Sequence, residues 1–345
     1  MFKDIQNKSP LYILIGNHDL PNPDSFLIHE HPFTALHNWA NTFVSDIGID
    51  KKINGKRFLF MPYVLPGRFY EALSHLLNVK EQYGECVEYS KSNESVPVEY
   101  NAQYEQLLAL LKENNKRDNR DFTKEELDSL MEKSRKEILF RSRVIPLFRP
   151  LINDVIAIFA HQEFFLCHNG PKRSNEGDYW PEGFPFIITG HIHEHRQLQS
   201  NLLYTGIPFQ HTSADANDKT VSFFSFTDGD WKEERISLAI PKRRKLIVQA
   251  LDFPAFILPE GYERDIIKVE VQGTTGEVSA AMKSSKWQDL RNLGIKVVPK
   301  PRTEDLVNSV ISGPQLNIRS YRERMDTVLQ EAPELLDLWR TLQRP

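Results

Sequence analysis

Three short apolar runs, far apart in the chain, each end in polar residues that include histidine. They are Leu11–Ile15, followed by Gly16-Asn17-His18-Asp19; Val155–Ala160, followed by His161; and Phe186–Thr189, followed by Gly190-His191-Ile192-His193. Apolar runs of this length that are rich in β-branched residues are typical of buried strands. In an open α/β sheet, ligands and metals bind beyond the carboxyl ends of the strands. We therefore predict an α/β fold in which the runs lie in one β-layer and their polar ends form a shared site.

The two histidines of the third run stand two residues apart. In an extended segment this spacing projects both side chains to the same side, so His191 and His193 can face one point. A histidine pair in a loop, taken alone, is more often part of the solvated surface than a metal site. The recurrence of histidine at three strand ends favours the metal site.

The composition suits a soluble globular protein. The chain has 345 residues, of which 40% are hydrophobic and 26% charged, so two domains or one large domain with insertions are expected. No apolar run approaches the ~20 residues that span a bilayer, and the stretch Met1–Lys8 does not resemble a signal peptide. Cys86 and Cys167 are far apart, which fits a reducing compartment such as the cytoplasm. The net charge of −4 gives no overall sign of nucleic-acid binding, which would need a local basic patch.

Three parts are predicted along the chain. They are a core over 1–240, a small α/β cap over 241–300, and a linker with a C-terminal helix over 301–345. Residues from about 78 to 149 are rich in Glu, Lys, Asn and Gln and indicate a helical insertion into the core. Its charges are interpreted as a solvated face, with partner binding as the alternative. One of its helices is expected to begin at Thr123 with a capping box.

The only dense basic cluster, Lys242-Arg243-Arg244-Lys245, marks the start of the cap. Within the cap, the pattern predicts a strand over 265–271, a helix over 275–293 and a second strand over 295–298. A small α/β unit separate from the core is therefore expected.

The polar strand ends carry donors that suit first-row divalent metals such as Mn²⁺, Fe²⁺ or Zn²⁺. Asn17 would supply a neutral oxygen, and His161, His191 and His193 would supply nitrogens. Two such ions about 3.5–4 Å apart can hold a phosphate ester and activate a water for attack. His18 could hydrogen-bond the phosphate or protonate the leaving oxygen. Asp19 could orient His18, or it could be a turn residue.

In this order, the motifs resemble the later half of the calcineurin-like metallophosphoesterase pattern. The part after the second run resembles more closely the SbcD-type recombination and repair nuclease subunit, in its phage and large-virus form. The matching stretches are His161-Gln162-Glu163, Gly177-Asp178-Tyr179-Trp180-Pro181, Gly190-His191-Ile192-His193 and Gln210-His211. The resemblance covers about residues 11–80 and 151–240.

This resemblance implies a layered β-sheet core flanked by helices, and a hydrolase that cuts DNA with two Mn²⁺ ions. It implies that Asn17, His161 and His191 bind one metal, that His193 binds the other, and that His18 assists the leaving group. The partners it implies are DNA, contacted by the cap and the Lys242–Lys245 cluster, and an SbcC-type coiled-coil ATPase, contacted by the C-terminal helix. It also suggests a homodimer, no membrane association, and the host cytoplasm if the protein is viral.

The sequence departs from this pattern at its start. The family's Asp-x-His and Gly-Asp motifs, which supply carboxylates to the metals, do not occur upstream of Leu11. We therefore expect a core without its N-terminal strands and a site with neutral ligands only, which would hold two dications poorly. Truncation or gene splitting, a degenerate inactive subunit, and ligands from another chain remain as explanations.

Three functions stay open from the sequence. The first is a nuclease subunit, and the second is a phosphatase or phosphodiesterase that acts on small molecules or phosphoproteins. The third is a non-catalytic module that binds the ATPase and DNA. Metal binding and DNA cleavage separate them.

Overall fold

The computed structural model describes residues 4–5, 7–22, 24–115, 122–169, 172–174, 176–212, 215, 219–227 and 230–302. The chain divides into two compact units, Met1–Ile240 and Pro241–Pro345. The predicted linker and C-terminal helix lie outside the described residues, except for Pro301 and Arg302. Among the helices within these ranges, none is both long and apolar enough to cross a bilayer.

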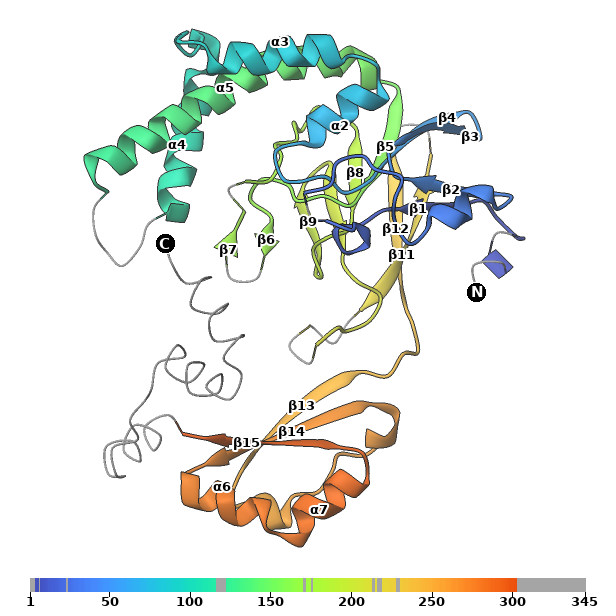
Figure 1. Ribbon diagram of the computed structural model, residues 1–345, viewed down its shortest axis with the longest axis vertical. Coiled ribbons are helices and arrows are strands. Elements are labelled where there is room, and N and C mark those ends of the chain that lie inside the picture. Colours follow the sequence, from blue (N-terminus) through green and yellow to red (C-terminus); the bar gives the residue numbers. More distant parts are fainter. Residues whose placement is uncertain are drawn as a thin grey trace, which may run out of the picture. The chain divides into compact units, whose positions relative to one another are not determined.

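A six-stranded sheet forms the centre of the first unit (Figure 1). Its order is β3 (Ile49–Ile53), β4 (Lys56–Met61), β5 (Val155–Ala160), β8 (Phe186–Thr189), β10 (Leu202–Thr205) and β9 (His195–Gln199). The four inner strands are parallel, and each outer strand pairs antiparallel with its neighbour. The second and third histidine-ended runs are thus the adjacent strands β5 and β8.

The first histidine-ended run forms β1 (Leu11–Leu14), which pairs in parallel with β2 (Thr42–Ser45). These two strands make a sheet of their own, so the expectation that all three runs lie in one layer is wrong in this respect. The backbone N–H of Tyr63, just beyond β4, donates to the carbonyl of Ile15 at 2.7 Å. Two further contacts join the β1–β2 pair to the central sheet: Tyr12 stacks on Phe60 with ring centroids 4.3 Å apart, and the Ser45 hydroxyl donates to the carbonyl of Phe60 at 2.7 Å. Together they bring the strand ends to one place.

Both faces of the central sheet are buried, because successive side chains of a strand point to opposite faces. On β4, Leu59 packs among residues of the helices α2 (Phe69–Leu76) and α5 (Lys124–Ile152), whereas Phe58 faces the other way. On that second face the sheet packs against the hairpin of β11 (Thr220–Phe226) and β12 (Trp231–Ser237). The predicted α/β fold, with a central sheet flanked by helices, is confirmed.

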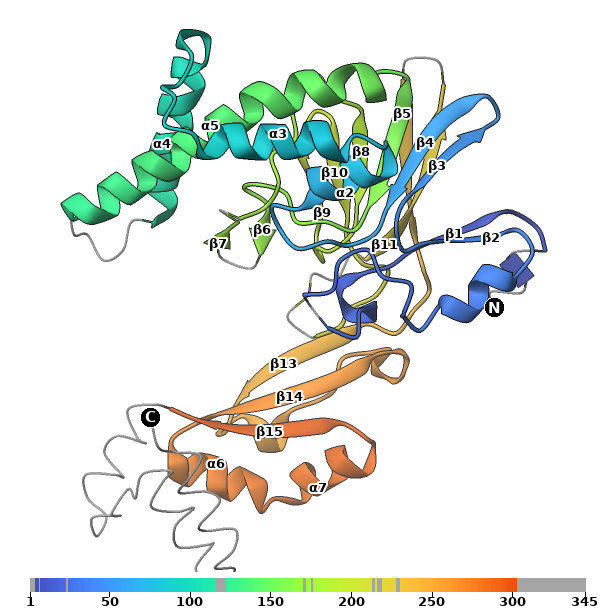
Figure 2. The same ribbon diagram turned by 45° about the horizontal axis from the view of Figure 1, so that its top comes forward.

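Between β4 and β5 the chain is helical. The helices are α2, α3 (Lys80–Lys91), α4 (Asn101–Asn115) and α5, with α3 packed along α5. α2 and the last turns of α5 cover one side of the sheet, whereas α4 packs on α5 away from it (Figure 2). The capping box predicted at Thr123 is present, since its side chain accepts the N–H of Glu126 and the Glu126 carboxylate accepts the N–H of Thr123.

The long helix α5 continues through Pro146 and Pro150, and its last turns belong to the core. Val144, Phe148 and Ile152 are fully buried against the sheet. The insertion is therefore anchored by the helix that covers the sheet.

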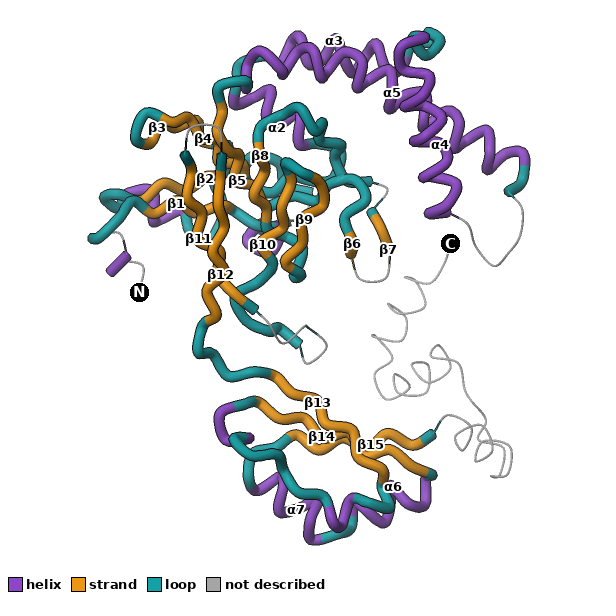
Figure 3. The backbone as a smooth tube through the Cα atoms, turned by 180° about the vertical axis from the view of Figure 1, so that it is seen from behind, coloured by secondary structure: helices purple, strands orange, loops and turns teal. Residues whose placement is uncertain are grey.

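The second unit is a parallel three-stranded sheet with helices on one face (Figure 3). Its elements are β13 (Arg243–Gln249), β14 (Ile266–Gly273), α6 (Thr275–Met282), α7 (Ser285–Asn292) and β15 (Lys296–Pro301). The predicted helix over 275–293 is two helices, because Ser284 accepts the N–H of Trp287 and begins a new one. Most of the basic cluster belongs to β13. The sequence analysis did not predict this strand, because its charged residues obscure the apolar pattern.

Within the residues that the structure describes, the remaining named elements are two short hairpin strands and five 3₁₀ helices. They are β6 (His168–Asn169), β7 (Lys172–Arg173), η1 (Asn17–Asp19), η2 (Thr34–Asn38), η3 (Val98–Tyr100), η4 (Phe253–Ala255) and η5 (Tyr262–Arg264).

Candidate metal centre

The parallel strands β5 and β8 place two of the predicted site segments side by side. Ala160 pairs with Thr189, and the N–H of Gly190 donates to the carbonyl of Ala160 at 3.0 Å. His161 and His191 follow directly, and their ring centroids lie 5.5 Å apart. Strand pairing thus brings two imidazoles to one edge of the sheet.

Asn17 reaches the same edge from β1. Its Oδ1 lies 3.1 Å from Nε2 of His161, although 144 positions separate the two residues. Two donor atoms that each lie about 2.1 Å from one octahedral ion are about 3.0 Å apart. The Asn17 and His161 donors therefore have the separation of two ligands of a single ion.

Two glycines make room for the His161 ring. A Cβ on Gly190 would lie 2.8 Å from Nδ1 of His161, and a Cβ on Gly16 would lie 3.3 Å from Nε2. The first distance is too short for any side chain, and the second leaves little slack. Gly190 is therefore required by the ring that it borders, whereas a side chain at position 16 would need the ring to shift by a few tenths of an ångström.

Burial, and after it the charges of the nearby His191, His18 and His193, lower the pKa of His161 to about 4. The ring is therefore neutral at pH 7, which is the form that binds a metal. The other three predicted histidines are thus near enough to His161 to act on its charge.

Two side chains hold the His191 ring, and its backbone is strained. Its ring stacks on Tyr63 at a centroid distance of 5.6 Å, and its Nε2 lies 3.5 Å from a carboxylate oxygen of Glu163. Its backbone φ is +76°, a left-handed conformation that costs a non-glycine residue about 1–2 kcal/mol. Strain of this kind is concentrated at functional sites, where the surrounding structure maintains it.

His193 lies on the solvent side of the site. Its side chain is 49% exposed, and its Nδ1 lies 3.6 Å from a carboxylate oxygen of Asp215. The ring stacks on His211 with centroids 5.0 Å apart, and Lys219 Nζ donates to the His193 carbonyl at 2.6 Å. His211 was noted in the sequence only as part of a matching motif.

Glu163 and Asp215 are candidate functional residues that the sequence analysis missed. Carboxylates behind metal-binding histidines fix the ring orientation and raise the basicity of the other nitrogen. With Nε2 of His191 and Nδ1 of His193 turned to carboxylates, Nδ1 of His191 and Nε2 of His193 are left for a metal. The site thus has negative charge beside ligands that the sequence analysis treated as neutral only. The spacing of Glu163, two residues after His161, could have revealed it, whereas no pattern marks Asp215.

His18 and Asp19 have different roles in the 3₁₀ helix that follows β1. The carboxylate of Asp19 accepts the N–H of Gly16 at 2.9 Å, so its interaction is that of a turn residue. His18 is exposed and acts electrostatically on His161. Of the two interpretations of Asp19, the structure favours the turn.

The loop from Gly177 to Pro181 supports the site without lining it. A Cβ on Gly177 would lie 2.3 Å from the backbone of Phe164, so no other residue fits. The Asp178 carboxylate accepts N–H groups from Gly67, Phe69 and the side chain of Gln162. Gln162 adjoins His161, so the loop braces the strand end that carries this ligand.

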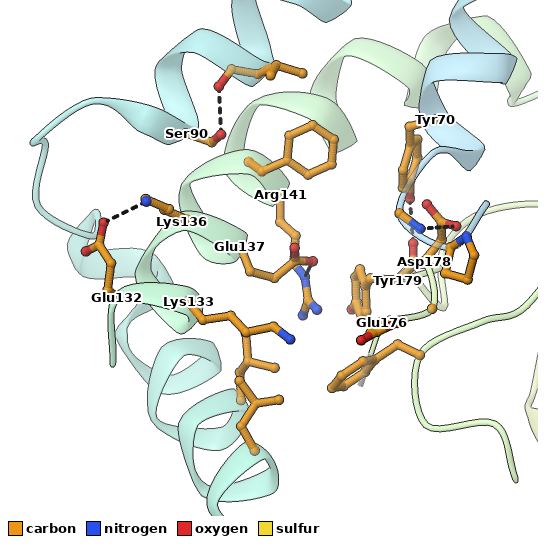
Figure 4. A pocket seen from close by; sticks show the side chains of 18 of the residues that line it. Tyr70, Ser90, Glu132, Lys133, Lys136, Glu137, Arg141, Glu176, Asp178 and Tyr179 are labelled. Atoms are coloured by element: carbon orange, nitrogen blue, oxygen red, sulfur yellow. Dashed lines mark hydrogen bonds and ion pairs between the residues drawn. The ribbon is translucent and has the colours of Figure 1, made fainter. Parts of the chain in front are cut away.

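Burial raises the pKa of Asp178 to about 7, and its three N–H donors act in the opposite direction. Asp178 and Tyr179 border a cavity of about 740 Å³ between the loop and helices α3 and α5 (Figure 4). Tyr70, Glu137 and Arg141 also line it, but none of the predicted ligands does. A smaller cavity of about 360 Å³ is bordered by His161 and Gly190.

Two viral proteins match most of the chain. One, of Invertebrate iridescent virus 6, bears the name "Putative phosphoesterase 244L"; it is 30% identical over 280 residues, which are 80% of this chain and 73% of the relative. This chain belongs to a phosphoesterase family. A second relative, "Putative phosphoesterase 078R" of Invertebrate iridescent virus 3, is 24% identical over 326 residues, 94% of this chain and 74% of its own length. No protein-family model matches. The coarser prediction, a phosphoesterase, is confirmed; the SbcD-type nuclease stays a prediction.

Proposed function

We propose that this phosphoesterase is the metal-dependent nuclease subunit of a DNA recombination and repair complex of the SbcD type. The observation that carries the proposal is the contact between Asn17 and His161, with the other predicted histidines acting on the same ring. An amide oxygen and several imidazoles at one edge of a sheet are the donors that the sequence resemblance leads us to expect.

The donors at this edge fit a divalent first-row ion. Asn17, His161 and His191 would hold one ion and His193 the other, with Glu163 and Asp215 orienting two of the imidazoles. We take Mn²⁺ as the metal, as the resemblance implies. When bound, such ions offset the charge of the phosphate diester and acidify the attacking water.

His18 is the proposed catalytic acid. It is exposed, follows Asn17 directly and acts electrostatically on His161, so we place it beside a phosphate bound at this edge. As water attacks phosphorus and the bond to the leaving oxygen breaks, His18 gives a proton to that oxygen. In the ground state it donates a hydrogen bond to the phosphate.

The second unit offers a surface for the DNA backbone. Its helices cover one face of the sheet, and strand register places Lys245, Lys268 and Lys296 in one row on the other face. Lysines in such a row bind phosphates without regard to base sequence. Lys268 is partly neutralised, because its Nζ lies 2.6 Å from a carboxylate oxygen of Glu270, so Lys245 and Lys296 are the stronger candidates. Within the basic cluster, Arg244 is partly neutralised, because its Nε lies 2.6 Å from Asp265.

DNA binding by the basic cluster is tested through its salt dependence. Replacing Lys242 and Lys245 with glutamine should reduce the slope of log K against log salt by about 2, near 0.9 for each phosphate contact. Arg244→Gln should change it less, since Asp265 already offsets that charge. An unchanged slope in the double variant means that the cluster is only a solvated surface.

The proposal of an SbcC-type ATPase partner, and of a homodimer, is supported by the sequence resemblance alone. The segment expected to bind the ATPase, within 301–345, lies outside the described residues apart from Pro301 and Arg302. Co-purification of the full chain with such an ATPase tests this part of the proposal.

The test of the function compares two substrates in Mn²⁺. We expect the purified chain to cut end-labelled duplex DNA, to lose this activity in a chelator, and to lose it in His161→Ala. Hydrolysis of a phosphate monoester without DNA cleavage would replace the nuclease by a phosphatase. DNA binding with neither reaction would leave a non-catalytic subunit.

A further inference from the structure

A second histidine cluster lies apart from the residues proposed as metal ligands. His29, His37 and His31 surround the carboxylate of Asp46, with ring nitrogens 2.6, 3.0 and 3.5 Å from the same oxygen, Oδ2. The Asp46 side chain is 3% exposed. Within the described part of the chain, imidazoles are the only side chains that pair with it. A buried carboxylate needs positive charge close by, and a cation among these rings would provide it.

His31 orients the cluster and is not a ligand itself. The backbone N–H of Phe33 donates to its Nδ1 at 3.2 Å, so the neutral ring carries its proton on Nε2. That proton points to Asp46, and the His31 side chain is 0% exposed. His31 therefore holds the carboxylate in place from the inner side, as supporting residues do in metal sites.

The other two imidazoles and the carboxylate have the arrangement of ligands. The donor atoms of His29, His37 and Asp46 all lie within 4.8 Å of one another. Donors at about 2.0–2.2 Å from a tetrahedral ion are about 3.4 Å apart, so only small shifts would close the site around one. The His29 and His37 side chains are 66% and 37% exposed, which leaves one side open to solvent.

We propose that His29, His37 and Asp46 form a zinc site with an open fourth position. Two imidazoles and one carboxylate are a common set of protein ligands for Zn²⁺. Nitrogen-rich sites of this kind bind Zn²⁺ more tightly than Mn²⁺. This site goes beyond the proposed nuclease function and uses none of its residues.

Local structure places these ligands. Thr34 donates to the carbonyl of His29 at 2.6 Å, accepts the N–H of His31 at 3.2 Å, and begins η2, which carries His37. η2 packs against β2, and Asp46 is the residue after that strand.

Zinc would tie this loop to the strand beside β1. Ser45, which precedes Asp46, accepts the N–H of Ile15 at 3.3 Å. Ile15 stands two residues before Asn17, so the site stabilises the neighbourhood of the candidate metal centre without belonging to it.

The test is a Co²⁺ and Zn²⁺ titration of the full chain after metal removal. Co²⁺ in a tetrahedral site absorbs visible light strongly, and Zn²⁺ should displace it. We expect the double variant His29→Gln/His37→Gln to lose one tightly bound Zn²⁺ per chain, with the affinity of that site lowered more than about 100-fold. Removal of a residue that only supports a ligand costs about 10- to 100-fold in affinity. The double variant His161→Gln/His193→Gln should still bind that Zn²⁺ ion. Loss of the proposed nuclease site and loss of the proposed zinc site therefore give different results.

His195→Gln is the matched control, because His195 pairs with Glu233 outside both clusters. Should the double variant at 29 and 37 fold poorly, the single change at the exposed His29 should still weaken Zn²⁺ binding at least about tenfold. Titration curves for His29→Gln/His37→Gln that superimpose on the wild-type curve would overturn the proposal. So would a tight equivalent that disappears only with the changes at His161 and His193.

Discussion

The two histidine clusters use their carboxylates in opposite ways. In the candidate metal centre, Glu163 and Asp215 approach His191 and His193 at 3.5 and 3.6 Å, where they orient the rings. In the second cluster, the Asp46 carboxylate is in the middle, and three rings point at one of its oxygens. A carboxylate next to the ring nitrogen that does not bind the metal orients the imidazole and raises its basicity. A carboxylate whose oxygen lies among several imidazoles can instead bind the metal ion itself.

The clusters also differ in how the chain builds them. The candidate metal centre gathers residues from the ends of β1, β5 and β8, so it exists only when the strands have paired. The second cluster comes from a loop, a short helix and one strand end. The first is therefore expected to depend on the global fold and the second on local structure.

The largest expected effect is on catalysis. His161→Ala should lower DNA cleavage by at least about 10³-fold, because several kcal/mol of charge stabilisation depend on the bound metal. It should leave Zn²⁺ binding at the second cluster unchanged, and His195→Ala should leave both unchanged. Loss of Zn²⁺ binding in His161→Ala would mean that the two clusters are one system. Cleavage is measured on end-labelled duplex DNA.

The supporting carboxylate should have a smaller effect. Glu163→Gln keeps the size of the side chain but removes its charge, so Mn²⁺ affinity should fall about 10- to 100-fold. Calorimetric titration of the metal-free protein measures this change. Wild-type affinity in the variant would show that Glu163 does not act on His191.

The strained backbone of His191 allows a comparison of two substitutions. Both His191→Ala and His191→Gly should lose most Mn²⁺ affinity, since both remove the imidazole. In the metal-free state the glycine variant should be more stable by about 1 kcal/mol, because glycine adopts φ near +76° without strain. Urea unfolding provides the measurement. Unchanged Mn²⁺ affinity in the alanine variant would remove His191 from the site.

The last prediction concerns the dependence of stability on pH. The folded-state pKa of His161 is about 4, below the ordinary value of 6.5, so the unfolded chain binds a proton between these values that the folded chain does not. This contribution to stability is complete above pH 6.5 and is lost as the pH falls toward 4.

For Asp46, burial acts to raise the pKa, but the hydrogen bonds and charges of its histidines lower it overall. The contribution of Asp46 to the free energy of unfolding is therefore lost only below pH 3.8.

NMR titration of the His161 ring is the suitable measurement, with a midpoint expected near pH 4 in the metal-free protein. A global unfolding curve would mix effects, because burial raises the pKa of Asp178 to about 7 and gives the opposite slope over the same range. A His161 midpoint near 6.5 would contradict the buried, neutral ring.

Much of the candidate metal centre was predictable because strands that pack into a protein core leave a strong apolar pattern. Asn17, His161 and His191 stood at the ends of such runs, and the structure brings all three to one edge. The second cluster was not predictable in this way. His29, His37 and Asp46 share no period, because each comes from a different kind of local structure.

Tertiary packing decided elements that local signals obscured. α5 continues through Pro146 and Pro150 because its last turns bury Val144 and Phe148 against the sheet, and that burial outweighs the missing backbone donors. β13 was not predicted, because charged residues surround its apolar positions. Its alternate residues Leu246 and Val248 nevertheless pack in the core of the second unit.

The order of residues is enough to show which side chains end the strands and that they are imidazole and amide donors. Folding added what these runs do not contain: β1 meets the central sheet through the Ile15 carbonyl and the Tyr12 ring, and Glu163, Asp215 and Asp46 lie beside histidines. The reason is physical. Strand periodicity is a local property of the chain, whereas the partner of a carboxylate depends on which loops the packed sheet brings within a few ångströms.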